Sequence, residues 1–192
     1  MVRTREFDPD TALDSALEVF WIKGYNACSV ADVVAETGVA RYGLYQEFGD
    51  KDDLFRAALE RYRSLATDLF LKPLHAPEAG RAEINAHFEN FISMMEAGDR
   101  RGCMACQAAM DRAQQDPGVA EIVDKTMADM RDAFRHVLAN ALKNNEMRRL
   151  PLDSLTDYLT GLQRTLGTMV RTKTPASEIT GYIRCALKLL DP

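Results

Sequence analysis

The 192-residue sequence contains no long apolar run, and this absence limits the class of protein. A helix that spans a bilayer needs roughly 20 consecutive apolar residues, and no segment approaches that length. The first ten residues, MVRTREFDPD, also lack the apolar block of a secretory signal. The four cysteines are scattered, which suits a reducing compartment better than a disulfide framework. We therefore expect a globular cytoplasmic protein with no membrane partner.

Signatures of catalysis are missing as well. The sequence has no glycine-rich phosphate loop, no metal motif and no paired carboxylates beside a nucleophile. One C-x-x-C motif is present at residues 103–106. However, Ala109 stands where an all-helical peroxide-reducing protein would have histidine, and the βαβ context of thioredoxin is absent. We expect neither enzymatic activity nor a metal or cofactor.

Positive charge is not in excess. The net charge is −5, and residues 1–55 contain only five basic residues against eleven acidic ones. The five are Arg3, Arg5, Lys23, Arg41 and Lys51. Proteins that bind nucleic acid commonly show the opposite balance. Any DNA contact in this segment must therefore depend on where a few cations lie, and we expect modest non-specific affinity with a marked dependence on salt.

Helical spacing runs through the whole sequence, and we find no convincing strand pattern. Apolar residues recur at i, i+3, i+4 and i+7 in about nine segments, separated by connectors such as KPLHAPEAG at 72–80. The face expected for the fourth helix consists of Leu54, Ala58, Tyr62, Leu65 and Leu69. The pattern predicts an all-α fold: a three-helix helix-turn-helix domain at 1–50, joined through a fourth helix to a helical bundle within 51–192.

Residues 29–59, SVADVVAETGVARYGLYQEFGDKDDLFRAAL, contain the clearest motif. Two short helices are predicted on either side of Gly38, and this spacing is typical of a helix-turn-helix. Leu44 and Phe48 lie four residues apart and can face the core. Arg41, Tyr42 and Gln46 are then left on other sides of the helix, where they could meet base edges. On spacing alone, a small helical hairpin without DNA is the alternative.

This stretch strongly resembles the DNA-binding region of the TetR family of transcriptional regulators. The resemblance covers about residues 1–60. It is carried by Phe20, Gly24-Tyr25, Ser29-Val30, Gly38-Val39, Leu44-Tyr45, Phe48, Lys51 and Leu54. By position, it implies base contacts from Arg41, Tyr42, Gly43 and Gln46. It implies phosphate contacts from Ser29, Tyr45 and Lys51.

Elementary physics supports several of these roles. Ser29 and Lys51 lie at predicted helix N-termini, where free N–H groups and the helix dipole favour an anion. Gly43 lacks a side chain, so we expect the backbone there to approach the DNA groove closely. Arg3 and Arg5 could form a basic arm that reaches DNA.

The resemblance also implies what the second half of the chain does. In this family the bundle binds a small effector and pairs two subunits, so we expect a homodimeric repressor that the effector releases from a double-stranded DNA operator. The last two helices, about 152–172 and 176–190, are the expected dimer interface.

The nine methionines suggest an adaptable apolar cavity for a hydrophobic or aromatic effector. Candidate pocket residues are Phe88, Phe91, Met95, Met110, Met130, Phe134, Gln163 and Met169. Ordinary core packing is the alternative for each of them.

The C-x-x-C motif raises a second possibility for sensing. Cys103 and Cys106 lie at a predicted helix start, where the helix dipole and the nearby Arg100 and Arg101 would lower the pKa of a thiol. A thiol-based repressor that senses redox state or electrophiles through these cysteines is therefore the alternative function. Both cysteines could also simply be small residues that pack the sixth helix.

Overall fold

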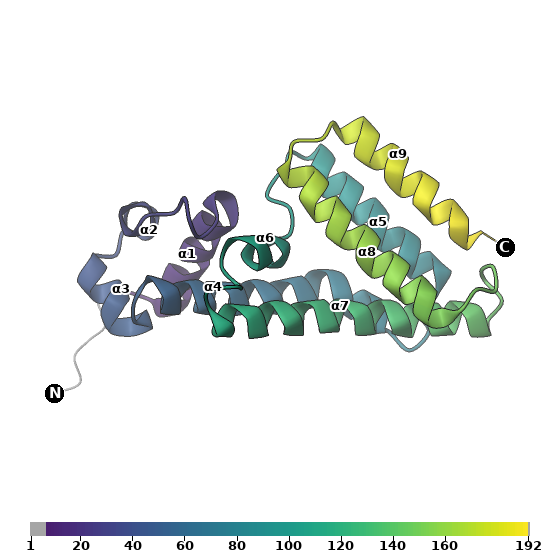
Figure 1. Cartoon of the computed structure of the whole chain (residues 1–192), viewed down its shortest axis with the longest axis horizontal. Coiled ribbons are helices and arrows are strands. Elements are labelled where there is room, and N and C mark those ends of the chain that lie inside the picture. Colours follow the sequence, from purple (N-terminus) through teal and green to yellow (C-terminus); the bar gives the residue numbers. More distant parts are fainter. Residues whose placement is uncertain (1–6, 192) are drawn as a thin grey trace.

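The computed structural model describes residues 7–191, so the predicted basic arm at Arg3 and Arg5 lies outside the described residues. Within this range the chain forms nine α-helices and no strand, which confirms the all-α prediction (Figure 1). The helices are α1 (Pro9–Lys23), α2 (Val30–Thr37), α3 (Arg41–Phe48), α4 (Lys51–Ala66), α5 (Arg81–Glu96), α6 (Met104–Asp111), α7 (Pro117–Lys143), α8 (Leu152–Arg171) and α9 (Ala176–Leu187). None of the helices in this range combines the length and apolar composition that crossing a membrane requires.

Side-chain caps fix where the N-terminal helices begin. Ser29 caps α2 and exchanges hydrogen bonds with Asp32, and Asp50 does the same for α4 with Asp53. Each such reciprocal cap provides acceptors for two backbone N–H groups that the start of a helix would otherwise leave unpaired. Between α2 and α3, Gly38 adopts the left-handed conformation with φ of 68°, which side chains other than glycine rarely tolerate.

Two clusters of buried apolar side chains hold the helices together. The first joins α1–α4 to α6 and the start of α7, with Phe20 and Phe55 in edge-to-face contact at 5.1 Å between ring centroids. The second lies among α5, α7, α8 and α9. α4 and the long α7 run side by side along the molecule and join the two ends (Figure 1). The division of the chain at residue 50 stays a prediction.

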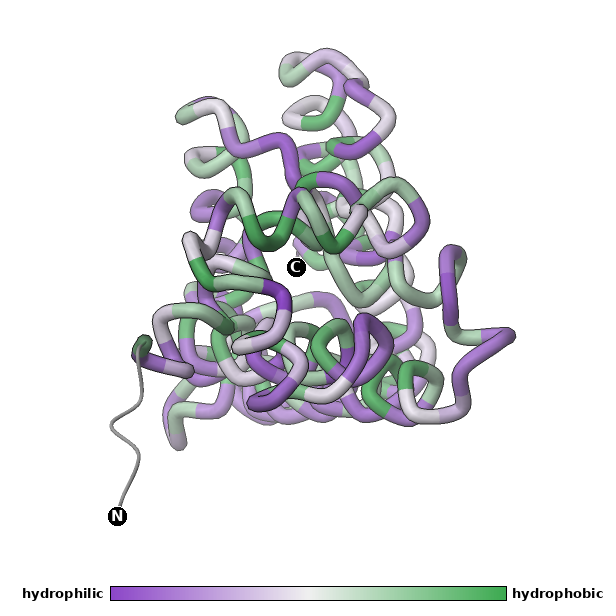
Figure 2. The backbone as a smooth tube through the Cα atoms, turned by 90° about the vertical axis from the view of Figure 1, so that its left-hand side faces the viewer, coloured by the Kyte–Doolittle hydropathy of each residue, from purple (hydrophilic) through white to green (hydrophobic). Residues whose placement is uncertain are grey.

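Hydrophilic and hydrophobic residues alternate along the helices, as expected where each helix buries one face (Figure 2). The fourth helix departs from the predicted pattern. Leu65 and Leu69 were expected on its inner face, but they are 37% and 63% exposed. For Leu69 the reason is a π-helical turn at Thr67–Leu71, in which Phe70 and Leu71 pack against the core instead. Leu65 precedes this turn. A 3-10 turn at Lys72–His75 then leads toward α5.

Candidate DNA-binding surface and effector pocket

The helix after the glycine turn presents a polar face to solvent. Arg41, Tyr42 and Gln46 are exposed on α3, while Leu44 on its other side is fully buried. The Arg41 guanidinium lies 5.0 Å from the centroid of the Tyr45 ring, close enough for a cation–π contact. The structure therefore brings the three predicted base-reading side chains onto one short exposed helix, next to Tyr45.

Gly43 has a different neighbour from the one expected. A Cβ atom at this position would lie 3.2 Å from Phe7 Cε1 and 3.2 Å from Val39 Cγ1, tighter than ordinary contact. The glycine therefore makes room for Phe7, just before α1, on the side of α3 that faces the protein. The close approach of the Gly43 backbone to the DNA groove and a base contact there both stay predictions.

Ser29 lies exposed at the start of α2. Its hydroxyl donates to the Asp32 carboxylate at 2.8 Å and accepts the Asp32 backbone N–H at 3.1 Å. Lys23 pairs with the same carboxylate at 2.7 Å, and these contacts hold the pKa of Asp32 well below its usual range. The predicted phosphate site at Ser29 is thus a capped helix N-terminus next to a paired aspartate.

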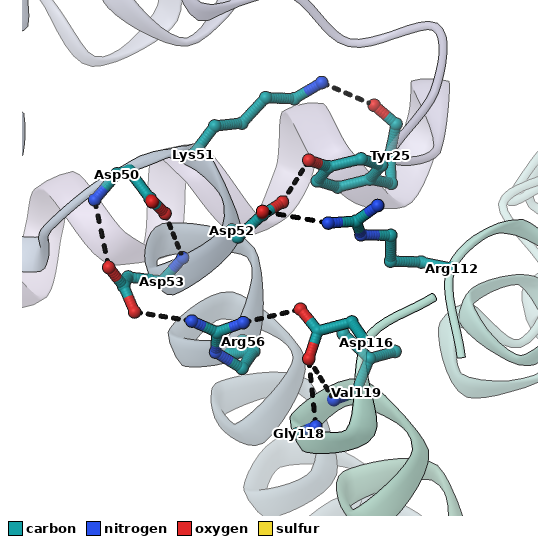
Figure 3. A network of polar contacts seen from close by, with 10 residues as sticks. All are labelled: Tyr25, Asp50, Lys51, Asp52, Asp53, Arg56, Arg112, Asp116, Gly118 and Val119. Atoms are coloured by element: carbon teal, nitrogen blue, oxygen red, sulfur yellow. Dashed lines mark hydrogen bonds and ion pairs between the residues drawn. The ribbon is translucent and has the colours of Figure 1, made fainter. Parts of the chain in front are cut away.

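Lys51, the third predicted phosphate contact, is held by a residue that sequence reasoning left without a role. Its ammonium group donates to the Tyr25 carbonyl oxygen at 2.8 Å and lies 4.1 Å from the centroid of the Tyr25 ring. The Tyr25 hydroxyl donates to Asp52, whose carboxylate pairs with Arg112 at 2.8 Å. Burial, followed by the bond to Asp52, raises the pKa of Tyr25 to about 12, so the phenol keeps its proton. Figure 3 shows this chain of contacts.

A second set of contacts in Figure 3 joins the caps of two helices. Arg56 bonds Asp53, in the first turn of α4, at 2.6 Å and also pairs with Asp116. Asp116 caps α7 by accepting the backbone N–H groups of Gly118 and Val119. Burial would raise the pKa of Asp116, but the Val119 N–H and Arg56 outweigh it and lower the pKa. The starts of α4 and α7 are therefore tied together.

An apolar cavity of about 90 Å³ lies between the end of α4, α5, the start of α6, α7 and α8. Four of the predicted pocket residues line it: Phe91, Met95, Met130 and Gln163. The other four do not. Phe88 and Phe134 are fully buried in the core, with parallel rings 6.1 Å apart, and Met169 packs against the same core. Met110 is 68% exposed, because it lies near the C-terminal end of α6, away from the pocket.

His87 and Gln163 are two polar side chains in the wall of this cavity. His87 Nδ1 lies 3.3 Å from the Phe70 carbonyl oxygen, and Nε2 lies 3.0 Å from Gln163 Oε1. Burial lowers the pKa of His87, so the ring is neutral at pH 7. A neutral imidazole has a single N–H, so His87 donates either to the Phe70 carbonyl oxygen or to Gln163 Oε1.

Cys103 caps α6 and lines the same cavity. Its sulfur accepts the Cys106 backbone N–H at 3.4 Å and the Tyr62 hydroxyl at 3.5 Å. The hydrogen bond from the Cys106 side chain, together with these two bonds, lowers the pKa of Cys103 to about 6, although burial acts in the opposite direction. The same bond between the two cysteines raises the pKa of Cys106. Arg101 does not act on the thiol as predicted, because it pairs with Asp99 and Glu18.

The start of α6 also touches two other helices closely. A Cβ atom on Gly102 would lie 2.4 Å from the Gly167 carbonyl oxygen, so the backbones of the loop and of α8 are in direct contact. The Trp21 indole N–H of α1 donates to the Gly102 carbonyl oxygen at 2.8 Å. Sequence reasoning gave no role to Trp21, although it lines the cavity and belongs to the N-terminal helices. Among the described residues, no group of three histidine, cysteine, aspartate or glutamate side chains is placed to hold a metal.

Known proteins match this arrangement. Residues 12–58 match the family described as bacterial regulatory proteins, tetR family. Over the full length of both chains, the sequence is 27% identical to the uncharacterized HTH-type transcriptional regulator YezE of Bacillus subtilis strain 168. The chain therefore carries a TetR-family DNA-binding domain at residues 12–58. It is a DNA-binding transcriptional regulator, as the resemblance of residues 29–59 implied.

Two further similarities cover different shares of this chain. Sixty residues, 31% of this chain and 29% of the other, are 52% identical to the HTH-type transcriptional repressor ComR of Escherichia coli K12. The whole fold is similar to a cysteine mutant of the TetR-family regulator CifR in complex with 26-bp double-stranded operator DNA, with a TM-score of 0.84. That similarity covers 98% of this chain and 99% of CifR at 21% identity.

Proposed function

We propose that this TetR-family regulator is a homodimeric repressor that binds a double-stranded DNA operator through α3 and leaves it when a small hydrophobic effector enters the cavity. The observation that carries the proposal is the composition of the cavity wall. Trp21 of α1, Cys103 of α6 and Gln163 of α8 all line it. An effector in this cavity therefore touches the N-terminal helices and the C-terminal bundle together. Residues 1–50 would read DNA and residues 51–192 would sense and dimerise.

The acidic composition of the N-terminal segment does not oppose this proposal. Glu18 pairs with Arg101 at 2.6 Å and Asp52 pairs with Arg112 at 2.8 Å, and both arginines come from the second half of the chain. Paired carboxylates repel a phosphate less than free ones do. The exposed face of α3 retains Arg41, which supplies the cation for base reading.

The dimer interface that we propose is the outer surface of α8 and α9. Tyr182 of α9 is 43% exposed, and Leu189, in the 3-10 turn that follows α9, is 41% exposed. A Cβ atom on Gly161 or Gly181 would meet nothing within 4 Å. Apolar side chains and small residues on two adjacent helices suit close packing against a second copy. A two-fold dimer would also present two copies of α3 to successive major grooves.

The size of the cavity limits the effector. At about 90 Å³ it is smaller than a cavity of roughly 150 Å³, which holds benzene. The effector is therefore a compact apolar molecule, or the flexible side chains of Met94, Met95 and Met130 move aside to admit a larger one. The side-chain amide of Gln163 in the cavity wall would favour a ligand with one polar group.

The effector would act by shifting a population between two states of the dimer. It binds more tightly to the state in which the spacing of the two α3 helices does not fit the operator. By thermodynamic linkage, operator and effector must then weaken each other by the same factor. The regulator would act in the cytoplasm and without enzymatic activity.

The test combines DNA binding and ligand binding. The purified protein is titrated onto the DNA upstream of its own coding sequence across a salt series, while compact apolar compounds are screened by the fluorescence of Trp21, the single tryptophan. We expect a hit to change the emission and to release the DNA. A compound that binds the protein equally well with and without operator is not the effector. If the protein binds no upstream DNA at low salt, the proposed repressor function is refuted.

A second candidate function is favoured by the state of Cys103. A thiol whose pKa is about 6 is largely thiolate at neutral pH, and this one faces a cavity. Thiolates react with oxidants and electrophiles far faster than thiols do. In this reading Cys103 is the sensor, with Cys106 three residues later as its partner, and a small electrophile or oxidant takes the place of the reversible effector. Loss of operator binding after oxidation of the wild type, and its retention in Cys103→Ser, would support it.

A further inference from the structure

We infer that Arg112, in the turn after α6, positions Lys51 for phosphate contact by holding the carboxylate of Asp52 away from it. Arg112 itself would not touch DNA. The inference rests on the proposed phosphate contact of Lys51. If it holds, DNA affinity depends on Arg112, a residue of the second half of the chain.

The sequence itself creates the conflict that Arg112 resolves. Asp52 directly follows Lys51 in the first turn of α4, within a segment where eleven acidic residues face five basic ones. Adjacent residues on a helix do not face each other, but both of these side chains reach Tyr25, the Lys51 ammonium at its ring and the Asp52 carboxylate at its hydroxyl. A carboxylate and an ammonium on the same ring can form a charge-assisted hydrogen bond unless another partner takes one of them. A Lys51–Asp52 pair would neutralise the cation that has to meet a phosphate.

The structure shows both oxygens of Asp52 occupied by other donors. The Tyr25 hydroxyl bonds Oδ1, and the Arg112 guanidinium bonds Oδ2 at 2.8 Å. Lys51 bonds the neutral Tyr25 carbonyl oxygen instead, at 2.8 Å. An ammonium group carries three N–H donors, so this single bond fixes its position and leaves capacity for phosphate.

Tyr25 holds the two cations and the carboxylate in one cluster (Figure 3). Lys51 Nζ lies 4.1 Å and the guanidinium carbon of Arg112 lies 4.7 Å from the centroid of its ring. The side chains of Arg112 and Asp52 are only 23% and 31% exposed, so solvent screens their pairing incompletely. Removing Arg112 would leave a partly buried carboxylate with one neutral donor, and Lys51 is the nearest cation in sequence.

The position of Arg112 also ties this cluster to the cavity. It directly follows the eight-residue helix α6, whose other end, at Gly102 and Cys103, lines the cavity and packs on α8. A helix this short moves as one rigid piece. A displacement of its first turn would carry Arg112 away from Asp52, so that Asp52 turns to Lys51.

The test measures the salt dependence of binding to a random-sequence DNA duplex, because phosphate contacts alone govern it. Each phosphate contact contributes about 0.9 to the slope of log K against log salt, or about fivefold to tenfold in affinity near 0.1 M salt. We expect Lys51→Ala to lower the slope by about one contact. We expect Arg112→Gln to lower it by a similar amount, and the double variant to be no weaker than Lys51→Ala alone.

Two further variants distinguish positioning from a general structural role. Arg112→Lys keeps the charge and should retain most of the slope. Asp52→Asn combined with Arg112→Gln removes the competing carboxylate and should restore it. Arg61→Gln, which breaks the Arg61–Asp14 pair between α4 and α1, is the matched control and should leave the slope unchanged. Thermal unfolding of every variant monitors folding.

The outcomes separate the inference from the proposal on which it rests. If Lys51→Ala leaves the slope unchanged, Lys51 does not contact phosphate, and the proposed role and the inference both fall. Two outcomes would keep the phosphate contact of Lys51 but overturn the positioning role of Arg112. In the first, Lys51→Ala lowers the slope and Arg112→Gln does not. In the second, the effects of the two substitutions on affinity add in the double variant. Failure of Asp52→Asn to rescue a folded Arg112→Gln also overturns the positioning role.

Discussion

The indole N–H of Trp21 donates to the carbonyl oxygen of Gly102 at 2.8 Å, across 81 residues of sequence. Trp21 lies near the C-terminal end of α1, the first of the N-terminal helices. Gly102 lies just before α6, in the wall of the cavity. The Arg101 guanidinium lies 3.9 Å from the Trp21 ring centroid, and the Tyr62 ring centroid lies 4.9 Å away. Trp21 is thus a direct physical link between the helices that read DNA and the cavity.

The first prediction concerns the strength of this link. Trp21→Phe leaves the Gly102 carbonyl oxygen without its donor and removes part of the ring contact with Arg101. We expect the free energy of unfolding to fall by about 1–3 kcal/mol, the cost of a partly buried unpaired polar group. Urea unfolding followed by circular dichroism measures it. The adjacent Ile22 is 58% exposed, so Ile22→Ala should change stability by at most about 0.5 kcal/mol. Equal losses in the two variants would contradict the link.

The second prediction concerns base reading by α3. Arg41→Ala removes the cation that lies over the Tyr45 ring on the exposed face of the helix. We expect operator affinity to fall by about 1–3 kcal/mol, or roughly 5- to 150-fold, while binding to random DNA changes little. A gel-shift assay with specific and random duplexes measures both. Arg135→Ala breaks an exposed pair with Asp153 far from α3 and serves as control. Unchanged operator affinity in Arg41→Ala would remove it from base reading.

The third prediction concerns the reactivity of Cys103 as a function of pH. The folded protein lowers the pKa of Cys103 from an ordinary value of 9.0 to about 6, so the thiolate forms at lower pH than in a free cysteine. The rate of alkylation by iodoacetamide should therefore rise through about pH 6 and level off above neutral pH. Peptide mass mapping follows Cys103 separately from Cys106, whose raised pKa keeps it a thiol, and from the exposed Cys185. A rate at Cys103 that keeps rising to pH 9 would contradict the lowered pKa.

The fourth prediction concerns dimerisation. Gly161 on α8 has open space where its Cβ would be, so Gly161→Arg introduces no clash within one subunit. We expect the variant to keep its thermal stability as a folded chain but to elute as a monomer in size-exclusion chromatography with light scattering. Ala82→Arg on the exposed face of α5 is the control and should not change the oligomeric state. A dimer that survives Gly161→Arg would place the interface elsewhere.

The local sequence was sufficient for the helices and for the motif of residues 29–59. Apolar spacing, the caps at Ser29 and Asp50 and the turn at Gly38 act over a few residues, so their consequences can be read without knowing the fold. The same locality explains the error at Leu69. Periodicity assumes an uninterrupted α-helix, and a single π-helical turn rotates the buried face by an amount that the pattern does not contain.

The pocket was predicted only in part for a related reason. Methionine and phenylalanine residues mark apolar helix faces, and the sequence does not say which buried faces pack and which leave a space. Phe88 and Phe134 pack against each other, whereas Phe91 and Met130 face the cavity. Trp21 reaches the same cavity from α1, distant in sequence, and no pattern connected it to the pocket.

The sequence by itself determined an all-helical chain with a TetR-type reading helix and a cysteine pair at a helix start, because caps, spacing and turn residues act locally. Only the tertiary structure decided which charges meet. The segment that appears too acidic for DNA receives Arg101 and Arg112 from the second half of the chain, and Lys51 is held by Tyr25 rather than by the aspartate beside it. Electrostatic energies depend on distances between side chains, and those distances are set by packing and not by separation along the chain.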